Sequence, residues 1–486
     1  MKVRRLGLLT FHGGVALFWV ASVGSLLARE VWHPWLNSQG PPTVLKPPVL
    51  GPEGRESWMG IYAEKTKIGY LHQKEGADPS GGSVMWQEGR VVLSMLGERR
   101  DLSFNSDIRT DAQGQIDRFS TVLQFAPTRI LVEGTRTGKT LTLKIQQGQA
   151  SWTSNVPLTQ PAILPSHIPG LIASGQLKPG QSLQITLIDP FTFQPGQVEI
   201  LFNGRRSFVF GGKRNLANQI ELRYQGLVTT SWIADDGTVL MEESPWGWML
   251  RREDQAKAVH IDLAEWSHPP DFLSMVAVPT EVWIRQPREV TFLELTLARP
   301  DRPTPEHLTL RVAQPPAVPW KRPILDPAFA PELAATPFIQ VNDPAIQRKA
   351  AAIVGTEMDS WQAARRINDW VYRSVRKVPT LGLPVSTEVL RKPAGDCNEH
   401  TCLFVALARS SGIPCRIVMG LVYFEGSFVY HTWPRVFVGS WVDLDPTLGQ
   451  APADATHVPL MEADLEESVR MASLVGKLQI VVESYR

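Results

Sequence analysis

The cysteines of this chain all lie in one short stretch. Cys397, Cys402 and Cys415 are the only three among 486 residues. Clustered in this way they cannot form a disulfide framework, and neither CxxC nor HExxH, which are spacings typical of zinc ligands, occurs. The chain must therefore fold on hydrophobic cores, for which its apolar content of 43% is ordinary. Its length suggests about two to three domains.

The charges are balanced, with 49 Lys and Arg against 48 Asp and Glu. No basic stripe interleaved with aromatic residues stands out, so the sequence does not predict nucleic-acid binding. The balance indicates a soluble surface of mixed sign and leaves the oligomeric state open.

The N-terminus carries a targeting signal. Lys2, Arg4 and Arg5 precede an apolar run at residues 6–27, which is near the roughly 20 residues needed to cross a bilayer. Positive residues before such a run keep that end in the cytoplasm, so we expect an inner-membrane anchor with the bulk of the chain in the periplasm. A cleaved signal peptide, which would make the protein secreted, and a buried core helix are the alternatives. A proline-rich linker at residues 31–57 predicts a stiff spacer.

Residues 58–278 predict an antiparallel β domain, because short runs of Val, Ile, Thr, Tyr and Phe alternate with Gly and Asp turns. The predicted strands include Ile116–Phe125, Thr128–Thr135, Leu141–Gln146, Thr229–Ala234 and Thr238–Glu242. We expect a curved sheet, a half-barrel or a sandwich, with one helix near residues 165–174.

Four short motifs carry a resemblance for this β region: residues 67–70 (KIGY), residues 177–180 (LKPG), Trp232, and Asp236-Gly237. In these it loosely resembles the curved-sheet domains of periplasmic lipoprotein-handling proteins. That resemblance implies a concave face for a peptide or an acyl chain. The alternative is a structural platform for the domain that follows.

Residues 279–336 combine two strand-like runs, 290–297 and 307–312, with a proline-rich connection, and these strands can pair with either neighbour. Helices are expected to follow, one capped by Asp343 and another beginning near Asp359. Ala363, Ile367, Trp370 and Val371 recur at helical spacing and are expected to face a core.

Three runs near the C-terminus contain the residue types of thiol catalysis. They are residues 395–401 (GDCNEHT), 431–439 (HTWPRVFVG) and 441–447 (WVDLDPT). A helix is predicted at 402–409, so Cys397 stands near a helix start, where the dipole lowers a thiol pKa. His431, at the start of a predicted strand, can act as the base, and Asp445 on the next strand can orient its imidazole.

The same runs carry a specific resemblance. A G-x-C helix start, a G-I-P-x-R strand, an H-x-W strand and a W-x-x-x-D-P-T strand follow in order, and residues 386–390 and 454–457 are also family-like. Residues 337–486 thereby resemble the bacterial transglutaminase-like superfamily. The resemblance implies a papain-like α+β core with Cys397 as nucleophile, His431 as base and Asp445 as orienting acid. This chain departs from the family pattern at Arg435, two residues after the tryptophan of the H-x-W strand, where many members carry an acid.

Other residues of these runs have competing roles. Asp443 shares a strand face with Asp445 and is the alternative acid. His400 and His457 are expected to be structural, as are Cys402 and Cys415. Trp433 is expected either to shield the imidazole or to pack in the core. The backbone N–H of Cys397 is one expected oxyanion donor.

These features predict an exported, membrane-anchored thiol enzyme, an acyltransferase or a peptidase or amidohydrolase. It would act on amide bonds of proteins or peptides through a thioester, by transamidation or hydrolysis. The alternative is a non-catalytic exported binding or assembly module that uses the β domain. No D-x-D-x-D-G calcium loop occurs, and we expect neither a cofactor nor a metal.

Overall fold

The computed structural model describes residues 54–486 except for several internal stretches. Those stretches are 64, 80, 96–97, 126–127, 159–176, 189–194, 211, 225–226, 236, 246, 263–275, 379–383, 463–470 and 472–473. The described chain divides into two compact units, at 54–262 and 276–486. The predicted anchor, the proline-rich linker and the helix near 165–174 lie outside the described residues. Where the structure does describe the chain, no helix is long and apolar enough to cross a bilayer.

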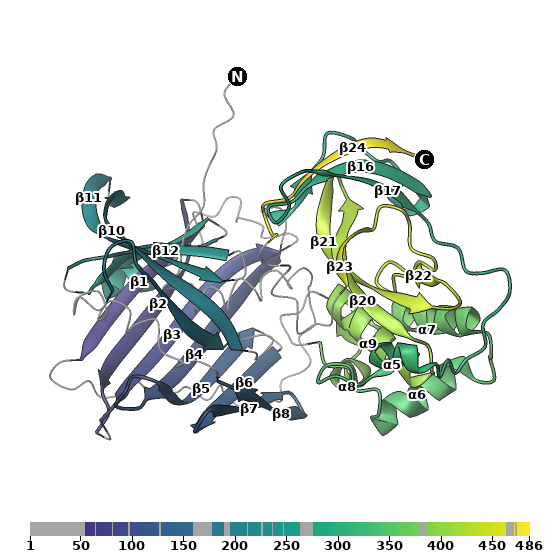
Figure 1. The fold of residues 1–486 in the computed structure, drawn as a ribbon, viewed down its shortest axis with the longest axis horizontal. Helices are drawn as coiled ribbons and strands as arrows, with labels where there is room; N and C mark the ends of the chain where they lie inside the picture. Colours follow the sequence, from purple (N-terminus) through teal and green to yellow (C-terminus); the bar gives the residue numbers. More distant parts are fainter. Residues whose placement is uncertain are drawn as a thin grey trace. The chain divides into compact units, whose positions relative to one another are not determined.

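The described residues of the first unit form one antiparallel sheet of 14 strands (Figure 1). Its strands are β1 Arg55–Ala63, β2 Thr66–Ala77, β3 Ser83–Met95, β4 Glu98–Thr110, β5 Ile116–Phe125, β6 Thr128–Thr137, β7 Thr140–Gln147, β8 Ala150–Pro157, β9 Ser182–Ile188, β10 Pro195–Phe210, β11 Lys213–Tyr224, β12 Leu227–Ile233, β13 Val239–Glu243 and β14 Trp248–Glu253. β1–β8 and β9–β14 each run as a meander, and the pairing of β1 with β14 joins the two meanders into one sheet.

The sheet confirms the predicted antiparallel, curled β region. The strand predicted at Ile116–Phe125 is β5, and the four other predicted strands correspond to β6, β7, β12 and β13. Every second residue of β7 from Leu141 to Ile145 is buried. This alternation is the pattern of a strand with one buried face, which explains why the strand could be predicted from the sequence. The short helix α3, Gln255–Val259, follows β14 and is capped by Asp254.

In the second unit, side-chain caps set where the helices begin. The longer helices are α6 Pro344–Val354, α7 Ser360–Ser374, α8 Ser386–Arg391 and α9 Cys397–Ser410, and α5 Ala330–Leu333 is a single turn. Asp343 accepts from Ala345 N at 2.7 Å, and Asp359 accepts from Trp361 N at 2.9 Å. The predicted cap at Asp343 and the predicted helix start near Asp359 are therefore confirmed.

The core-facing stripe predicted for α7 is partly wrong. Ala363, Ile367 and Val371 are buried, but Trp370 is only half-buried and carries Lys349 over its ring at 5.0 Å. Trp370 lies seven residues after Ala363, about 20° around the helix from it, and so stands at the edge of the buried stripe.

The described residues of this unit form two larger sheets besides one two-stranded pair. One has the order β15-β21-β20-β23, with β22 paired to β21, and the other has the order β17-β16-β24. Their strands are β15 Val278–Pro279, β16 Phe292–Ala298, β17 Glu306–Arg311, β20 Cys415–Phe424, β21 Ser427–Phe437, β22 Trp441–Asp443, β23 Val458–Glu462 and β24 Gln479–Tyr485. The short β18 Arg376–Lys377 and β19 Ala394–Gly395 pair in parallel.

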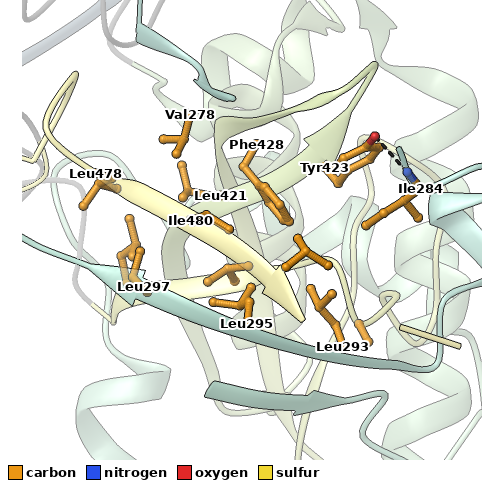
Figure 2. Close-up of a cluster of buried hydrophobic side chains, with 14 of the residues drawn as sticks. Val278, Ile284, Leu293, Leu295, Leu297, Leu421, Tyr423, Phe428, Leu478 and Ile480 are labelled. Carbon is orange, nitrogen blue, oxygen red and sulfur yellow. Dashed lines mark hydrogen bonds between the residues drawn. The ribbon is translucent and has the colours of Figure 1, made fainter. Parts of the chain in front are cut away.

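A hydrophobic core joins these two sheets (Figure 2). Leu293, Leu295 and Leu297 of β16 pack with Leu421 and Phe428 of β20 and β21. The two strand-like runs thus become β16 and β17, and β16 pairs with β17 on one side and with β24 on the other. This sheet packs against the sheet that bears the C-terminal motifs. The paired residues of β16 and β24, such as Ala298 and Gln479, lie more than 180 positions apart in sequence, a relationship that a local pattern cannot predict.

Candidate active site

Cys397 is the first residue of α9, several residues before the predicted helix start at 402. Asp396 caps the helix, accepting from Asn398 N at 2.8 Å, and Glu399 accepts from Asp396 N at 2.9 Å. This reciprocal pair is a capping box. It places the thiol at the positive end of the helix. Cys397 is partly exposed, whereas Cys402 and Cys415 are buried.

The helix is tied to strand β21 one turn further on. Thr401 follows Cys397 by four residues, so the two side chains share a helix face. The Thr401 hydroxyl donates to the carbonyl of Thr432 at 3.0 Å. Thr432 directly follows His431, and this bond therefore brings the face that carries Cys397 against the part of β21 that carries His431.

His431 lies in the middle of β21 and not at the strand start that the sequence suggested. It pairs with Gly420 of β20, where a Cβ would stand 2.1 Å from the Val458 carbonyl oxygen of β23. Glycine thus lets β23 approach closely beside His431. Trp433, two residues on, is fully buried and its ring stacks 6.1 Å from the His431 ring.

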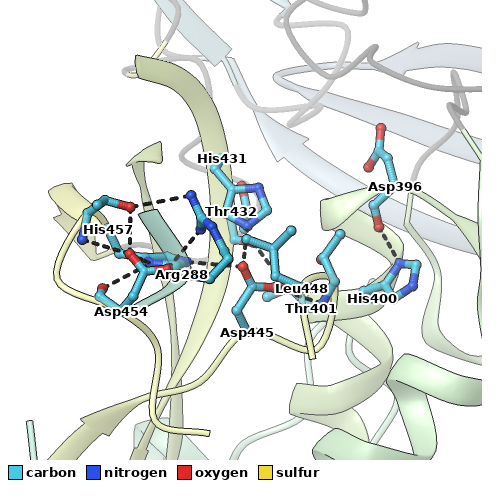
Figure 3. A network of polar contacts seen from close by, with 12 residues as sticks. Arg288, Asp396, His400, Thr401, His431, Thr432, Asp445, Leu448, Asp454 and His457 are labelled. Carbon is cyan, nitrogen blue, oxygen red and sulfur yellow. Dashed lines mark hydrogen bonds and ion pairs between the residues drawn. The ribbon is translucent and has the colours of Figure 1, made fainter. Parts of the chain in front are cut away.

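Asp445 is the carboxylate that contacts His431. His431 Nε2 and Asp445 Oδ2 are 2.8 Å apart, and Figure 3 shows the two side chains facing each other. Asp445 Oδ1 accepts from the backbone N–H groups of Thr447 at 2.7 Å and Leu448 at 3.0 Å. Burial alone would raise the pKa of Asp445, but the imidazoles beside it hold that pKa well below its ordinary value. The carboxylate is therefore ionised at neutral pH.

Asp443, the alternative acid, is occupied elsewhere. It pairs across β21 and β22 with Arg435, whose Nε lies 2.5 Å from Asp443 Oδ1. Arg435 also contacts Glu462. The arginine that departs from the family pattern therefore engages two carboxylates of its own sheet. Asp445 lies beyond the end of β22, where a two-way backbone pairing with Gln450 turns the chain.

A second histidine, which the sequence led us to expect in a structural role, approaches the same carboxylate. His457 Nε2 lies 3.0 Å from Asp445 Oδ2, and His457 Nδ1 lies 3.1 Å from the backbone carbonyl of Asp454. Arg288, far away in sequence, contacts Asp454 at 2.8 Å. The family-like run 454–457 was the only sequence signal for the contacts of His457 and Asp454, and nothing in the sequence singled out Arg288.

The remaining candidates have packing roles. His400 is fully buried, with Nδ1 2.7 Å from the Asp396 carbonyl and Nε2 3.2 Å from the Val375 carbonyl. Cys402 Sγ donates to the backbone carbonyls of Phe338 and Pro384. These contacts join α9 to Val375, Phe338 and Pro384. Neither His400 nor Cys402 thus bonds His431 or Asp445.

The expected low pKa of the Cys397 thiol is wrong. Although Cys397 is partly exposed, the protein packed around it desolvates the thiol and raises its pKa well above the ordinary value. The carboxylates of Asp396 and Glu399 raise this pKa further, while the backbone of Thr432 acts in the opposite direction. The helix dipole favours a thiolate, but two acidic side chains of the capping box sit in the same turn. A neutral resting thiol follows, which needs a base to react.

His431, Asp445 and His457 each offer a ligand atom, and these atoms lie within 4.8 Å of one another. Imidazole and carboxylate are groups that zinc accepts. In this cluster, however, the Nε2 atoms of His431 and His457 already lie at hydrogen-bond distance from one oxygen, Asp445 Oδ2. A cation would have to displace both of these bonds, so the geometry fits a hydrogen-bonded network better than a metal centre.

Comparison with known families matches residues 347–446 to the Transglutaminase-like superfamily. The matched stretch contains Cys397, His431 and Asp445, and it confirms the resemblance drawn from the sequence motifs. No match was found among curated proteins.

Several solved structures show similarity. A proposed cysteine protease from Cytophaga hutchinsonii is 20% identical with a TM-score of 0.27, over 34% of this chain and 54% of that one. This chain therefore spans about half the length of that protein. A beta-barrel-like protein of unknown function from Brucella abortus is 11% identical with a TM-score of 0.31, over 41% and 98% of the two chains. A proposed protease from Parabacteroides distasonis is 8% identical with a TM-score of 0.20, over 68% and 69%.

Proposed function

We propose that the second unit is a thiol-dependent enzyme that cleaves amide bonds of proteins or peptides through a thioester on Cys397. One observation carries this proposal. A partly exposed cysteine at a helix N-terminus is tied, through Thr401 and Thr432, to a strand whose His431 bonds an ionised buried carboxylate. The match of residues 347–446 to the Transglutaminase-like superfamily supports it.

The geometry assigns roles to the two nitrogens of His431. Because Nε2 faces Asp445, Nδ1 is the nitrogen left to take the thiol proton. As the sulfur bonds to the amide carbon, the resulting imidazolium hands the proton to the leaving amine, which departs as the C–N bond breaks. The backbone N–H of Cys397 is the nearest helix donor for the oxyanion.

The thioester is then resolved by an acceptor. Water gives a carboxylic acid and an amine gives a new amide, and in both cases His431 removes the acceptor proton and returns it to the sulfur. Asp445 remains ionised throughout and stabilises the imidazolium. We favour a protein or peptide as the acyl donor, because amide bonds with amine leaving groups are what this arrangement of acid and base serves.

The test compares wild type with Cys397→Ala in the full chain. Ammonia release, new isopeptide bonds and new chain termini are followed together on a mixed protein substrate. Loss of all signals in Cys397→Ala, with Cys402→Ala unaffected, supports the proposal. Full complementation of a deletion strain by Cys397→Ala would instead favour a binding or assembly module built on the first unit.

We further propose that the enzyme acts outside the cytoplasm, held at the inner membrane by the apolar run at residues 6–27. The positive residues before that run and its length support this location. Fractionation and sequencing of the mature N-terminus separate an anchor from a cleaved signal, and soluble cytosolic protein would contradict both.

A further inference from the structure

Asp445 Oδ2 serves two imidazoles at once. His431 Nε2 lies 2.8 Å from this oxygen and His457 Nε2 lies 3.0 Å from it. The mechanism above uses only His431. His457 is nonetheless almost fully buried, as is Asp445. A second imidazole placed on the carboxylate of the proposed catalytic pair requires an explanation beyond core packing.

The second nitrogen of His457 also faces acceptors. Nδ1 lies 3.1 Å from the Asp454 carbonyl and 3.5 Å from Asp454 Oδ1. Two ring nitrogens that both face acceptors can be satisfied together only when both carry protons. Burial alone would lower the pKa of His457, but the hydrogen bonds to Asp445 and Asp454 raise it to about 9. The geometry and the charges thus agree on an imidazolium at neutral pH.

Asp454 is itself held in place. Its Oδ1 accepts from Thr456 N at 2.8 Å and from Thr456 Oγ1 at 2.5 Å, and its Oδ2 contacts Arg288 Nη1 at 2.8 Å. Arg288 also donates to the carbonyl of Tyr423, the penultimate residue of β20. Figure 3 shows this chain of contacts running from Arg288 to His431.

Charges of opposite sign alternate along this series of contacts, from Arg288 through Asp454 and His457 to Asp445, whose other partner is His431. Within the described residues, the titratable groups that face His457 are Asp445, Asp454 and His431, whose ring centre is 5.8 Å away. The edge of Trp433 closes the remaining side, with ring centres 5.0 Å apart at 81°. Each charge is thereby neutralised by the next, which makes a buried series of ions tolerable.

We propose that His457 is a positioning residue, which as an imidazolium fixes the Asp445 carboxylate and so sets both the tautomer and the basicity of His431. It acts in two ways. Its bond to Oδ2, together with the Thr447 and Leu448 amides on Oδ1, leaves the carboxylate one orientation. Its positive charge also interacts with the Asp445 carboxylate that His431 contacts, and this weakens the attraction of that carboxylate for a proton on His431. The inference rests on the proposed function, because it concerns the same site.

The experiment is histidine NMR on the full chain with ¹⁵N-labelled imidazoles. In wild type we expect the His457 signal to titrate near pH 9 and His431 to show the Nε2–H tautomer when neutral. His457→Gln removes the second cation, so Asp445 should hold a proton on His431 more strongly and the His431 signals should differ from those of wild type. Asp454→Asn keeps the shape, removes the charge behind His457, and should lower the His457 pKa. His307→Gln is the matched control, since His307 pairs with Glu483 at the surface.

Amide turnover is followed in parallel, with a fall of about 10–100-fold expected for His457→Gln and a smaller fall for Asp454→Asn. The inference is overturned if His457 is neutral between pH 6 and 8, or if the tautomer and titration of His431 are the same in wild type and both variants. If His457→Gln does not fold, Asp454→Asn decides through the His457 titration alone. Intact turnover in Cys397→Ala would remove the proposed function, while the titrations would still decide the role of His457.

Discussion

The Thr401 hydroxyl donates to the Thr432 carbonyl at 3.0 Å, and both residues are buried. This bond joins the helix of Cys397 to the strand of His431. Cys397 lies one helical turn before the donor Thr401, and His431 directly precedes the acceptor Thr432. Both proposed reacting groups are therefore close in sequence to the same hydrogen bond. The relationship makes the bond a sensitive point for both stability and chemistry.

Thr401→Val keeps the side-chain shape and removes the donor. The Thr432 carbonyl then loses a buried partner, which should lower the unfolding free energy by about 1–3 kcal/mol. Alkylation of Cys397 by iodoacetamide should also slow, because the bond that joins the helix of Cys397 to the strand of His431 is lost. Chemical denaturation and mass-spectrometric mapping measure the two effects. Thr296→Val, which removes an exposed bond to Glu483, is the control and should change neither. Equal behaviour of the two variants would contradict the role assigned to Thr401.

Asp445→Asn should reduce amide turnover by about 10²–10⁴-fold, because an amide no longer stabilises the imidazolium and can select the wrong tautomer. Asp443→Asn should retain turnover, since Asp443 pairs with Arg435 and not with His431. The two substitutions are chemically identical and two residues apart. If Asp443→Asn caused the larger loss, the assignment of the acid would be reversed.

Only Cys397 should react with a thiol reagent in the native protein. It is partly exposed, whereas Cys402 and Cys415 are buried. Peptide mapping after a short iodoacetamide pulse should find label at Cys397 in buffer and at all three positions in concentrated urea. Labelling of Cys402 under native conditions would show that the core around α9 opens readily.

The alkylation rate of Cys397 should keep rising above the ordinary thiol pKa, since burial and the nearby carboxylates raise its pKa. Glu399→Gln removes one of those charges and keeps a side-chain oxygen for the Asp396 N–H. Its apparent thiol pKa should therefore fall and its alkylation at pH 7 should accelerate. Measuring the rate against pH in both proteins checks the sign, and a slower or unchanged Glu399→Gln rate would count against it.

Leu295→Ala should destabilise the second unit by about 2–5 kcal/mol, because Leu295 is fully buried between its two sheets. Cys402 and Cys415 both lie in this unit, so the urea dependence of their exposure reports its unfolding alone. Val481→Ala on the neighbouring β24 is the control, since Val481 is 62% exposed. A small effect at Leu295 would mean that β16 is not part of this cooperative core.

His457 should also make the second unit's stability depend on pH. Its pKa of about 9 in the folded protein exceeds its ordinary value near 6.5, so its contribution is complete below about pH 6.5 and is lost as the pH rises through 9. Calorimetry at pH 7 and 9.5 should show a fall in the melting temperature that is smaller in His457→Gln. The transition of this unit is identified by its response to Leu295→Ala.

Local rules in the sequence determined much of this protein. The caps Asp343 and Asp359 and the alternation along β5 and β7 act over a few residues, so their elements could be predicted from the residues alone. The same helical periodicity wrongly predicted that Trp370 faces the core, because Trp370 lies at the edge of the buried face of α7 and is only half-buried.

Cys397, His431 and Asp445 were named from motifs, and their roles remain predictions, although the fold brings the residues His431 and Asp445 into contact. Strand alternation could not separate Asp443 from Asp445, since both share one face. Only tertiary structure decided that Arg435 takes the first and His431 the second.

The low thiol pKa that the sequence predicted from a helix start is reversed by the folded environment, because burial and neighbouring carboxylates outweigh the dipole. The pairing of β16 with β24 and the contact of Arg288 with Asp454 join residues more than 150 positions apart. Such contacts depend on how whole elements pack, which no local pattern records. The sequence by itself thus determined the elements and the candidate chemistry, whereas the tertiary structure alone decided which charges meet.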